Sequence, residues 1–395
     1  MSVQSQTQLW NRSFLLCVFN NLFLFTYYFA MLAVLPLYIM QELGGSVEQA
    51  GLALTLFLVS SIGIRPFSGL IIEKVGKKFA LRGAGALFVV FAVAFVWVDS
   101  LWSLLFLRFL HGFWFSILTT VNVPVVNDFI PEQRKGEGMG YFVMSTNLGV
   151  VFGPFIALTM IQFTSYETLF ILLSGITVLG YLFSLRLNIT SEPTQPKNQK
   201  TQPLQLHDIL EKKVLPISIV AMMTALAYSS ITSFITAFAE QQNVLAYASV
   251  FFIVFALSMI IVRPLVGKRY DRHGPSSVIY PSFVLFAIGL VIVSFMTNQW
   301  VLWLSAVFIG MGYGSLFPCM QTMAIQSVSK QRMGYAISTF FTCFDLGLAI
   351  GSVVMGLLIA SSSFQMTYLL CAVLVVLTLG LYSRWVVPQL KQQHS

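Results

Sequence analysis

Long apolar runs follow one another along nearly the whole chain, and short polar segments separate them. A helix needs about 20 consecutive, mainly apolar residues to cross the hydrocarbon core of a bilayer. The pattern therefore predicts an all-α integral membrane protein with twelve spans, at residues 13–40, 47–72, 79–98, 101–127, 136–162, 167–187, 214–240, 245–267, 276–296, 299–326, 333–360 and 364–387.

One connection, at residues 188–213, is longer and more polar than the others. Its content of Gln, Pro, Thr and Lys is typical of a flexible, solvated linker, and a short amphipathic helix is expected near Leu206–Leu210. The linker divides the chain into an N-terminal six-helix bundle (1–187) and a C-terminal six-helix bundle (214–395).

Composition supports this interpretation. Hydrophobic residues make up 57% of the 395 positions and charged residues only 9%, whereas a soluble domain carries roughly 25% charged residues. The sequence contains no phosphate-binding loop, no HExxH motif and no serine or cysteine triad outside the spans. We therefore expect no enzyme, no cofactor and no metal site, and an ion gradient rather than ATP as the energy source.

The basic residues are unevenly divided between the two sides of the membrane. With the N-terminus in the cytoplasm, every Lys and Arg except Arg65, Arg108 and Arg263 falls in a cytoplasmic segment or at its edge. The external loops then hold only acids, namely Glu42, Glu48, Asp99, Glu167 and Glu240. The positive-inside rule predicts a multi-pass protein of the cell membrane with both termini cytoplasmic. The basic charge faces anionic lipid, so nucleic-acid binding is not expected.

A shift of 198 residues maps one half of the chain onto the other. Arg65-Pro66-x-x-Gly69 becomes Arg263-Pro264-x-x-Gly267, and Glu73 becomes Asp271. Further matched pairs are Gly76 and Gly274, Gly112 and Gly310, Arg134 and Arg332, Gly136 and Gly334, Gly149 and Gly347, and Gly153 and Gly351. Two parallel six-span halves predict a pseudo-twofold axis along the membrane normal and a substrate site between the halves.

The segment after span 2, Gly69-Leu-Ile-Ile-Glu73-Lys-Val-Gly76-Lys77-Lys78, resembles G-x-x-x-D-x-x-G-R-K, a signature of the major facilitator superfamily. Glu73 replaces the usual Asp and keeps its charge. The resemblance covers the whole chain and implies that this acid faces the N-terminus of span 11, where a carboxylate is favourable by about 0.3–1 kcal/mol. It thus implies a conformational gate of Gly69, Glu73, Gly76, Lys77, Lys78, Arg134 and Asp271. Charges that only set topology are the alternative.

Span 4 carries Leu104-x-x-x-Arg108-Phe-Leu-His111-Gly112, which resembles the family's motif with a buried arginine. In proton-driven exporters of the family this motif is tied to proton coupling, so Arg108 and His111 are candidates for that role. Arg108 has no charged counterpart in the second half, and a charge inside a span is costly. The alternatives are a structural arginine held by polar neighbours and a satisfied polar histidine.

Span 5 reads Gly140-x8-Gly149-x3-Gly153-Pro154-x2-Ala157-Leu158 and resembles the family's antiporter motif without its last two glycines. The small residues are expected to let span 5 pack closely against the other half, and Pro154 to bend the helix. The resemblance implies an exporter. Ordinary packing of small residues is the alternative.

Two further acids have distinct predicted roles. Asp345 is the only carboxylate expected at mid-membrane, in span 11, and is a third candidate for proton coupling. It could instead pair permanently with an arginine or bind a cationic substrate. Asp128 resembles the acid at the end of the family's span 4 and is expected to form an ion pair at the cytoplasmic edge.

The resemblance places the substrate site at mid-membrane, on spans 1, 4, 7 and 10. Aromatic walls with a few amides suit an amphipathic organic molecule, and the candidates are Asn20, Asn21, Phe25, Tyr28, Phe115, Asn122, Tyr228, Phe234, Tyr313, Phe317 and Gln321. The sequence as a whole resembles the twelve-span drug:proton antiporters.

We therefore expect a monomeric, proton-coupled exporter of small organic molecules that works by alternating access. Its partners would be the small-molecule substrate, protons and the lipid bilayer. The alternatives are an exporter of one metabolite (a sugar, an amino-acid derivative or a metallophore), an uptake symporter, and a membrane receptor that does not transport.

Overall fold

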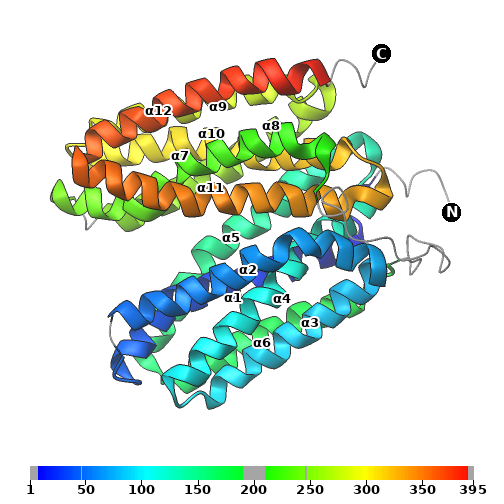
Figure 1. Cartoon of the computed structure of the whole chain (residues 1–395), viewed down its shortest axis with the longest axis vertical. Helices are drawn as coiled ribbons and strands as arrows, with labels where there is room; N and C mark the ends of the chain where they lie inside the picture. Colours follow the sequence, from blue (N-terminus) through cyan, green and yellow to red (C-terminus); the bar gives the residue numbers. More distant parts are fainter. Residues whose placement is uncertain (1–7, 46, 190–209, 245–246, 390–395) are drawn as a thin grey trace. The chain divides into compact units, whose positions relative to one another are not determined.

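The computed structural model describes residues 8–45, 47–189, 210–244 and 247–389 (Figure 1). Within these residues the chain is helical without strands, and twelve helices are long and apolar enough to cross a membrane. The predicted all-α, twelve-span fold is thus confirmed. The short helix predicted near Leu206–Leu210 lies almost wholly outside the described residues.

The long helices are α1 (Arg12–Gln41), α2 (Val47–Val75), α3 (Lys77–Ala94), α4 (Leu101–Asp128), α5 (Lys135–Phe163), α6 (Tyr166–Leu185), α7 (Leu215–Gln241), α8 (Ala248–His273), α9 (Ser276–Ser294), α10 (Gln299–Gln326), α11 (Met333–Ser361) and α12 (Phe364–Leu381). Short turns are η2 (Phe95–Trp97), η3 (Glu132–Arg134), η5 (Lys212–Val214), η7 (Lys330–Arg332) and η8 (Tyr382–Val386). Most predicted ends are correct within a few residues. However, α2 and α8 run past the predicted ends at 72 and 267, so Glu73 and Asp271 lie in helical turns rather than in loops.

The chain forms two compact units. Unit 1 comprises Met1–Pro131, Tyr141–Leu210 and Lys330–Ser338, and unit 2 comprises Glu132–Gly140, Glu211–Ser329 and Thr339–Ser395. The first residues of α5 therefore belong to unit 2, and the first residues of α11 belong to unit 1.

The same helix pairs are in contact in both units. In unit 1, α2 packs on α4, α3 on α4 and α6, and α1 on α6; in unit 2, α8 packs on α10, α9 on α10 and α12, and α7 on α12. The matched glycines Gly112 and Gly310 explain part of this packing. Each lies so close to a backbone carbonyl, that of Phe57 or Phe255, that a side chain would overlap it. The 198-residue shift also maps Phe57 onto Phe255, so the repeat preserves a helix contact as well as residue types.

The starts of four helices follow the same repeat. Side chains of Ser100, Ser165, Asn298 and Ser363 accept hydrogen bonds from backbone N–H groups in the first turns of α4, α6, α10 and α12. Such N-caps satisfy amides that have no partner inside the helix. The shift maps Ser100 onto Asn298 and Ser165 onto Ser363, so both halves start these helices by the same means.

Candidate functional site

Five of the predicted gate residues lie around the junction of α2 and α3 in unit 1, namely Gly69, Glu73, Gly76, Lys77 and Lys78; Arg134 and Asp271 belong to unit 2. Gly76 has φ +81°, a conformation that only glycine adopts readily, and the matched Gly274 has φ +79° at the end of α8. The turn after α2 and the matched turn after α8 therefore each require a glycine, at Gly76 and Gly274. Gly69 lies against the start of α11, because a Cβ on it would be 2.7 Å from Cα of Tyr335.

Glu73 faces the start of α11, where the Tyr335 hydroxyl donates a hydrogen bond to Oε2 of Glu73. The ring of Tyr335 also lies under the guanidinium of Arg332, whose Cζ is 4.3 Å from the ring centroid. Glu73, one methylene longer than the usual Asp, thus accepts from the hydroxyl at the end of the Tyr335 side chain.

Asp271, the repeat counterpart of Glu73, contacts the backbone at a helix start in unit 2. Its carboxylate accepts hydrogen bonds from the backbone N–H of Gly136 at 2.8 Å and of Glu137 at 3.1 Å, in the first turn of α5. These amides have no partner inside the helix, and the helix dipole favours a negative charge there. Arg134 pairs with Glu137 at 2.7 Å, one turn along.

The two contacts are related by the repeat. Gly267 lies against Glu137, as a Cβ on it would be 2.6 Å from Cα of Glu137. The 198-residue shift maps Gly69 onto Gly267 and Glu137 onto Tyr335. Gly69 of α2 and Gly267 of α8 therefore lie against residues that the repeat also matches, namely Tyr335 at the start of α11 and Glu137 at the start of α5.

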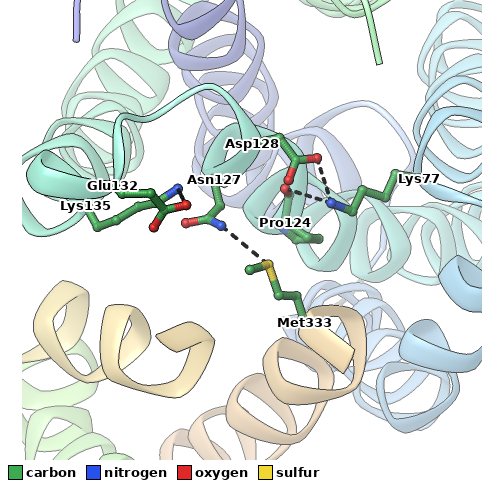
Figure 2. Close-up of polar contacts among 7 residues, drawn as sticks. All are labelled: Lys77, Pro124, Asn127, Asp128, Glu132, Lys135 and Met333. Carbon is green, nitrogen blue, oxygen red and sulfur yellow. Dashed lines mark hydrogen bonds and ion pairs between the residues drawn. The ribbon is translucent and has the colours of Figure 1, made fainter. Parts of the chain in front are cut away.

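The start of α3 is joined to the end of α4 (Figure 2). Nζ of Lys77 lies 2.6 Å from Oδ2 of Asp128 and 3.4 Å from the carbonyl oxygen of Pro124. The ion pair expected for Asp128 is thus confirmed, and its partner is a lysine of the family signature. In the same region Nδ2 of Asn127 donates to Sδ of Met333, at 3.4 Å. Lys78 lies in the same first turn of α3.

Arg108 is the largest fully buried side chain of the described residues, at 1% exposure. Its Cζ lies 4.4 Å from the centroid of the Phe57 ring. None of its three guanidinium nitrogens has a hydrogen-bond partner in the described chain. Within the described residues Arg108 therefore lacks the polar neighbours that the structural alternative requires. The cation is held by an aromatic face, an attraction worth about 2 kcal/mol or more when desolvated.

His111 is also buried, but both of its ring nitrogens have neighbours. Nε2 lies 3.2 Å from the carbonyl oxygen of Phe88, and Nδ1 lies 3.5 Å from the Tyr27 hydroxyl. The ring stacks on Phe95 with centroids 5.5 Å apart. An N–H donated to a carbonyl and three surrounding aromatic rings are the environment of a packing histidine.

Asp345 lies in the part of α11 that belongs to unit 2, with intermediate exposure.

The substrate candidates of unit 1 form two groups. Phe25, Tyr28 and Phe115 pack on one another, with Tyr28 and Phe115 stacked at 4.7 Å, and the latter two also contact the Phe57 ring on which Arg108 lies. Nδ2 of Asn20 donates to Oδ1 of Asn122 at 3.2 Å. This amide borders a small pocket between α1, α3, α4 and α6.

Asn21 differs from the other candidates on α1. Its Nδ2 donates to Ser145 at 2.9 Å and to Thr146 at 3.0 Å, both on α5, and the side chain is 2% exposed. These contacts join two helices of the same unit, so Asn21 acts in helix packing here.

The substrate candidates of unit 2 do not form one cluster. Tyr228 and Tyr313 stack with centroids 3.6 Å apart and planes 10° apart, whereas Phe317 packs on phenylalanines of α11. Phe234 lies against Gly356, also on α11. Gln321 is buried, and its Oε1 has no hydrogen-bond partner among the described residues.

The glycines of the antiporter-like motif approach α1. A Cβ on Gly149 would lie 2.8 Å from Cβ of Phe25, and one on Gly153 would lie 2.7 Å from the backbone nitrogen of Ala30. These neighbours belong to the same unit, which differs from the expected role against the other half. The matched Gly347 and Gly351 lie equally close to α7.

Close packing of these glycines is therefore a property of both halves, and it does not by itself indicate an exporter. Pro154, in the interior of α5, is not shared by the two halves, because the repeat matches it with Ser352. Gly140 lies apart from the other motif residues, with Arg263 as its nearest neighbour.

Among the described residues no group of three or more His, Cys, Asp or Glu side chains is placed to hold a metal.

Two residues of the site were missed by sequence reasoning. Phe57 supports Arg108 through its ring, and Tyr27 contacts His111. One phenylalanine in an apolar span carries no signal of its own when the chain has 36. The match of Phe57 with Phe255 in the repeat was the available clue to its position at a helix contact.

The fold and these motifs define a membrane transporter of two related halves, and comparison with known proteins agrees. The family model described as Major Facilitator Superfamily matches residues 16–279 and 245–395. The chain belongs to the major facilitator superfamily, a family of multi-pass membrane transporters of small molecules.

Two groups of relatives stand out. Multidrug resistance protein MdtG of Enterobacter lignolyticus (strain SCF1) is 23% identical over 357 residues, covering 87% of this chain and 84% of the relative. The staphylopine export protein of Staphylococcus aureus (strain Mu50 / ATCC 700699) is 20% identical over 350 residues, covering 85% and 86%.

Solved structures share the fold. The human organic anion transporter MFSD10 (TETRAN) has a TM-score of 0.80 at 14% identity, covering 94% of this chain and 98% of that one. The transporter FucP in the outward conformation has a TM-score of 0.74 at 16% identity, covering 93% and 98%.

Proposed function

We propose that this protein exports small amphipathic organic molecules across the cell membrane in exchange for protons, by alternating access. The carrying observation is Arg108, a buried cation without a hydrogen-bond partner, beside the aromatic group of Phe25, Tyr28 and Phe115. The similarity to multidrug resistance proteins along 87% of the chain supports the direction and the substrate class.

Proton coupling is assigned in this proposal to Arg108 and Asp345. An intramembrane carboxylate can bind and release a proton during transport. An unpaired arginine that approaches this carboxylate in one conformation favours the ionised form of the carboxylate there. His111 contributes packing, since its ring nitrogens are occupied by a carbonyl oxygen and a hydroxyl. The substrate site between the two halves remains a prediction, as do cytoplasmic termini and a monomeric state.

The gate in the proposal consists of the two repeat-related contacts, Glu73 with Tyr335 and Asp271 with the start of α5. Each is strong enough to favour one conformation by an amount of order 1 kcal/mol and weak enough to break during a cycle.

Proteoliposomes test the proposal. An imposed pH gradient should drive accumulation of a fluorescent amphipathic dye, and dye added on one side of the membrane should draw protons out of the opposite compartment to the side of addition. Asp345→Asn and Arg108→Gln should abolish the response to the gradient while energy-independent exchange of the dye persists. Asp99→Asn, at an exposed loop acid, is the matched control. Dye movement unaffected by the gradient, or full coupling in Asp345→Asn, refutes the proposal.

A second candidate is export of one metal-chelating metabolite. It is favoured by the similarity to the staphylopine export protein, which covers 85% of the chain. The same vesicles separate the two candidates: a transporter of one metabolite should respond to the chelator and ignore structurally unrelated dyes.

A further inference from the structure

Arg263, in α8, is a second buried cation without a partner. Its side chain belongs to a residue that is 3% exposed, and Nε, Nη1 and Nη2 all lack a hydrogen-bond partner within the described residues. Unlike Arg108, it has no aromatic ring beneath its guanidinium there. An unpaired charge in such a place is strongly unfavourable, so a compensating anion is expected in some state of the protein.

In the first half of the chain, the arginine at the same repeat position has hydrogen-bond partners for two of its three guanidinium nitrogens. The repeat maps Arg65 onto Arg263, and Arg65 donates to Oγ1 of Thr119 at 3.1 Å and to Oγ of Ser61 at 3.4 Å. The Ser338 hydroxyl in turn donates to the backbone carbonyl of Arg65. Two hydroxyl groups therefore accept from the guanidinium of Arg65, and a third donates to its backbone carbonyl.

All three hydroxyls are missing at the corresponding positions of unit 2. The shift replaces Ser61 by Met259, Thr119 by Phe317 and Ser338 by Gly140. Gly140 lies beside the arginine, since a Cβ on it would make ordinary contact with Cδ of Arg263, at 3.7 Å. The second half has thus kept the cation and lost the groups that satisfied it in the first.

Among the described residues, no acid of unit 2 takes their place. Asp271, two turns along α8, is bound to the start of α5, and Glu137 is paired with Arg134. The remaining ionisable neighbour of Arg263 is the Cys319 thiol on α10. The five N–H donors of Arg263 are therefore available to a ligand from outside the chain.

We propose that Arg263 binds a monovalent anionic group, supplied either by an acid on the transported molecule or by a small inorganic anion. A guanidinium presents parallel N–H groups that match the two oxygens of a carboxylate. In the first case the substrates of this protein include organic anions, a refinement that rests on the proposed transport function. In the second case the ion is a bound cofactor of unit 2.

The full-length protein, purified in detergent and sulfate buffer, is titrated with benzoate, with its uncharged isostere benzamide, and with chloride. Binding is measured by calorimetry and by the rise of the thermal unfolding midpoint. Benzoate should bind and stabilise the wild type, and benzamide should do neither. Arg263→Gln should weaken benzoate binding at least about tenfold, whereas Arg263→Lys should retain part of it.

Arg65→Gln is the matched control, since its position in the repeat is the same and hydroxyls are already present there. It should bind benzoate like the wild type. Stabilisation by chloride that depends on Arg263, without binding of benzoate, supports the inorganic source; binding of benzoate in competition with chloride supports the substrate source. Equal benzoate and chloride binding by wild type and Arg263→Gln, or binding of neither anion by the wild type, overturns the proposal.

Size-exclusion profiles identify variants that fail to fold, and the Lys variant then carries the test, because it keeps the charge and loses only the paired donors. These are equilibrium measurements without a pH gradient. Failure of proton-coupled export in vesicles would therefore leave the anion result standing, and loss of anion binding would leave proton coupling untouched.

Discussion

Replacing Gly69 by alanine should weaken the contact between α2 and the start of α11. The added Cβ would lie 2.7 Å from Cα of Tyr335 and 2.8 Å from its backbone nitrogen. Both neighbours are backbone atoms, so a rotamer change cannot relieve the overlap. Ordinary contact needs about 3.4 Å or more, and the two segments must therefore separate by roughly 0.7 Å.

Overpacking of this kind costs about 1–3 kcal/mol, which corresponds to a shift of about 5–150-fold in an equilibrium between two conformations. The hydrogen bond from Tyr335 to Glu73 is stretched by the same displacement. Because the cost falls only on the conformation in which these segments touch, Gly69→Ala should favour the conformation in which they are apart.

Hydrogen–deuterium exchange of the purified protein measures this effect. Backbone amides of residues 333–338 should exchange faster in Gly69→Ala by about the factor given above. Gly63→Ala is the matched control on the same helix, because it is exposed and a Cβ on it meets nothing within 4 Å. Gly267→Ala should have the equivalent effect at the start of α5. Exchange in Gly69→Ala that equals that of Gly63→Ala refutes the reasoning.

Three further substitutions test single contacts. Asp271→Asn should speed amide exchange in the first turn of α5, because it weakens two charge-assisted hydrogen bonds by about 1–3 kcal/mol in total; unchanged exchange there would contradict the assignment. Tyr335→Phe removes the hydroxyl that donates to Glu73 and should lower the free energy of unfolding by about 1 kcal/mol, as measured by denaturant titration. Phe57→Leu should cost about 2 kcal/mol more than Phe255→Leu, since only the first ring supports a buried arginine, and equal losses would show that the cation–π contact is unimportant.

The sequence predicted the scaffold well because its signals are local or strictly periodic. Apolar runs give spans directly, since every backbone polar group in a bilayer must be satisfied within a helix. The ends of α2 and α8 were the exception. The charged residues Glu73 and Asp271 suggested loops, but a helix can continue past the hydrocarbon core with its polar end in water.

The contacts of individual site residues could not be predicted to the same extent. Gly149 and Gly153 were assigned a role between the halves, yet they pack on α1 of their own unit. The spacing of small residues shows that one face of a helix lacks bulky side chains, but it does not show which neighbouring helix packs on that face. For the same reason the contacts of Asn21 with α5 were not predicted and Phe57 was missed.

The sequence by itself determined the twelve spans, the 198-residue repeat and the family, because these follow from hydrophobic length and from residues matched at a constant offset. Only the tertiary structure decided which buried charges are satisfied. Arg65 and Arg263 are equivalent in the sequence, but one lies among hydroxyls and the other has none. The free energy of a buried charge depends on the neighbours that folding brings to it from other helices, and no local pattern in the chain contains them.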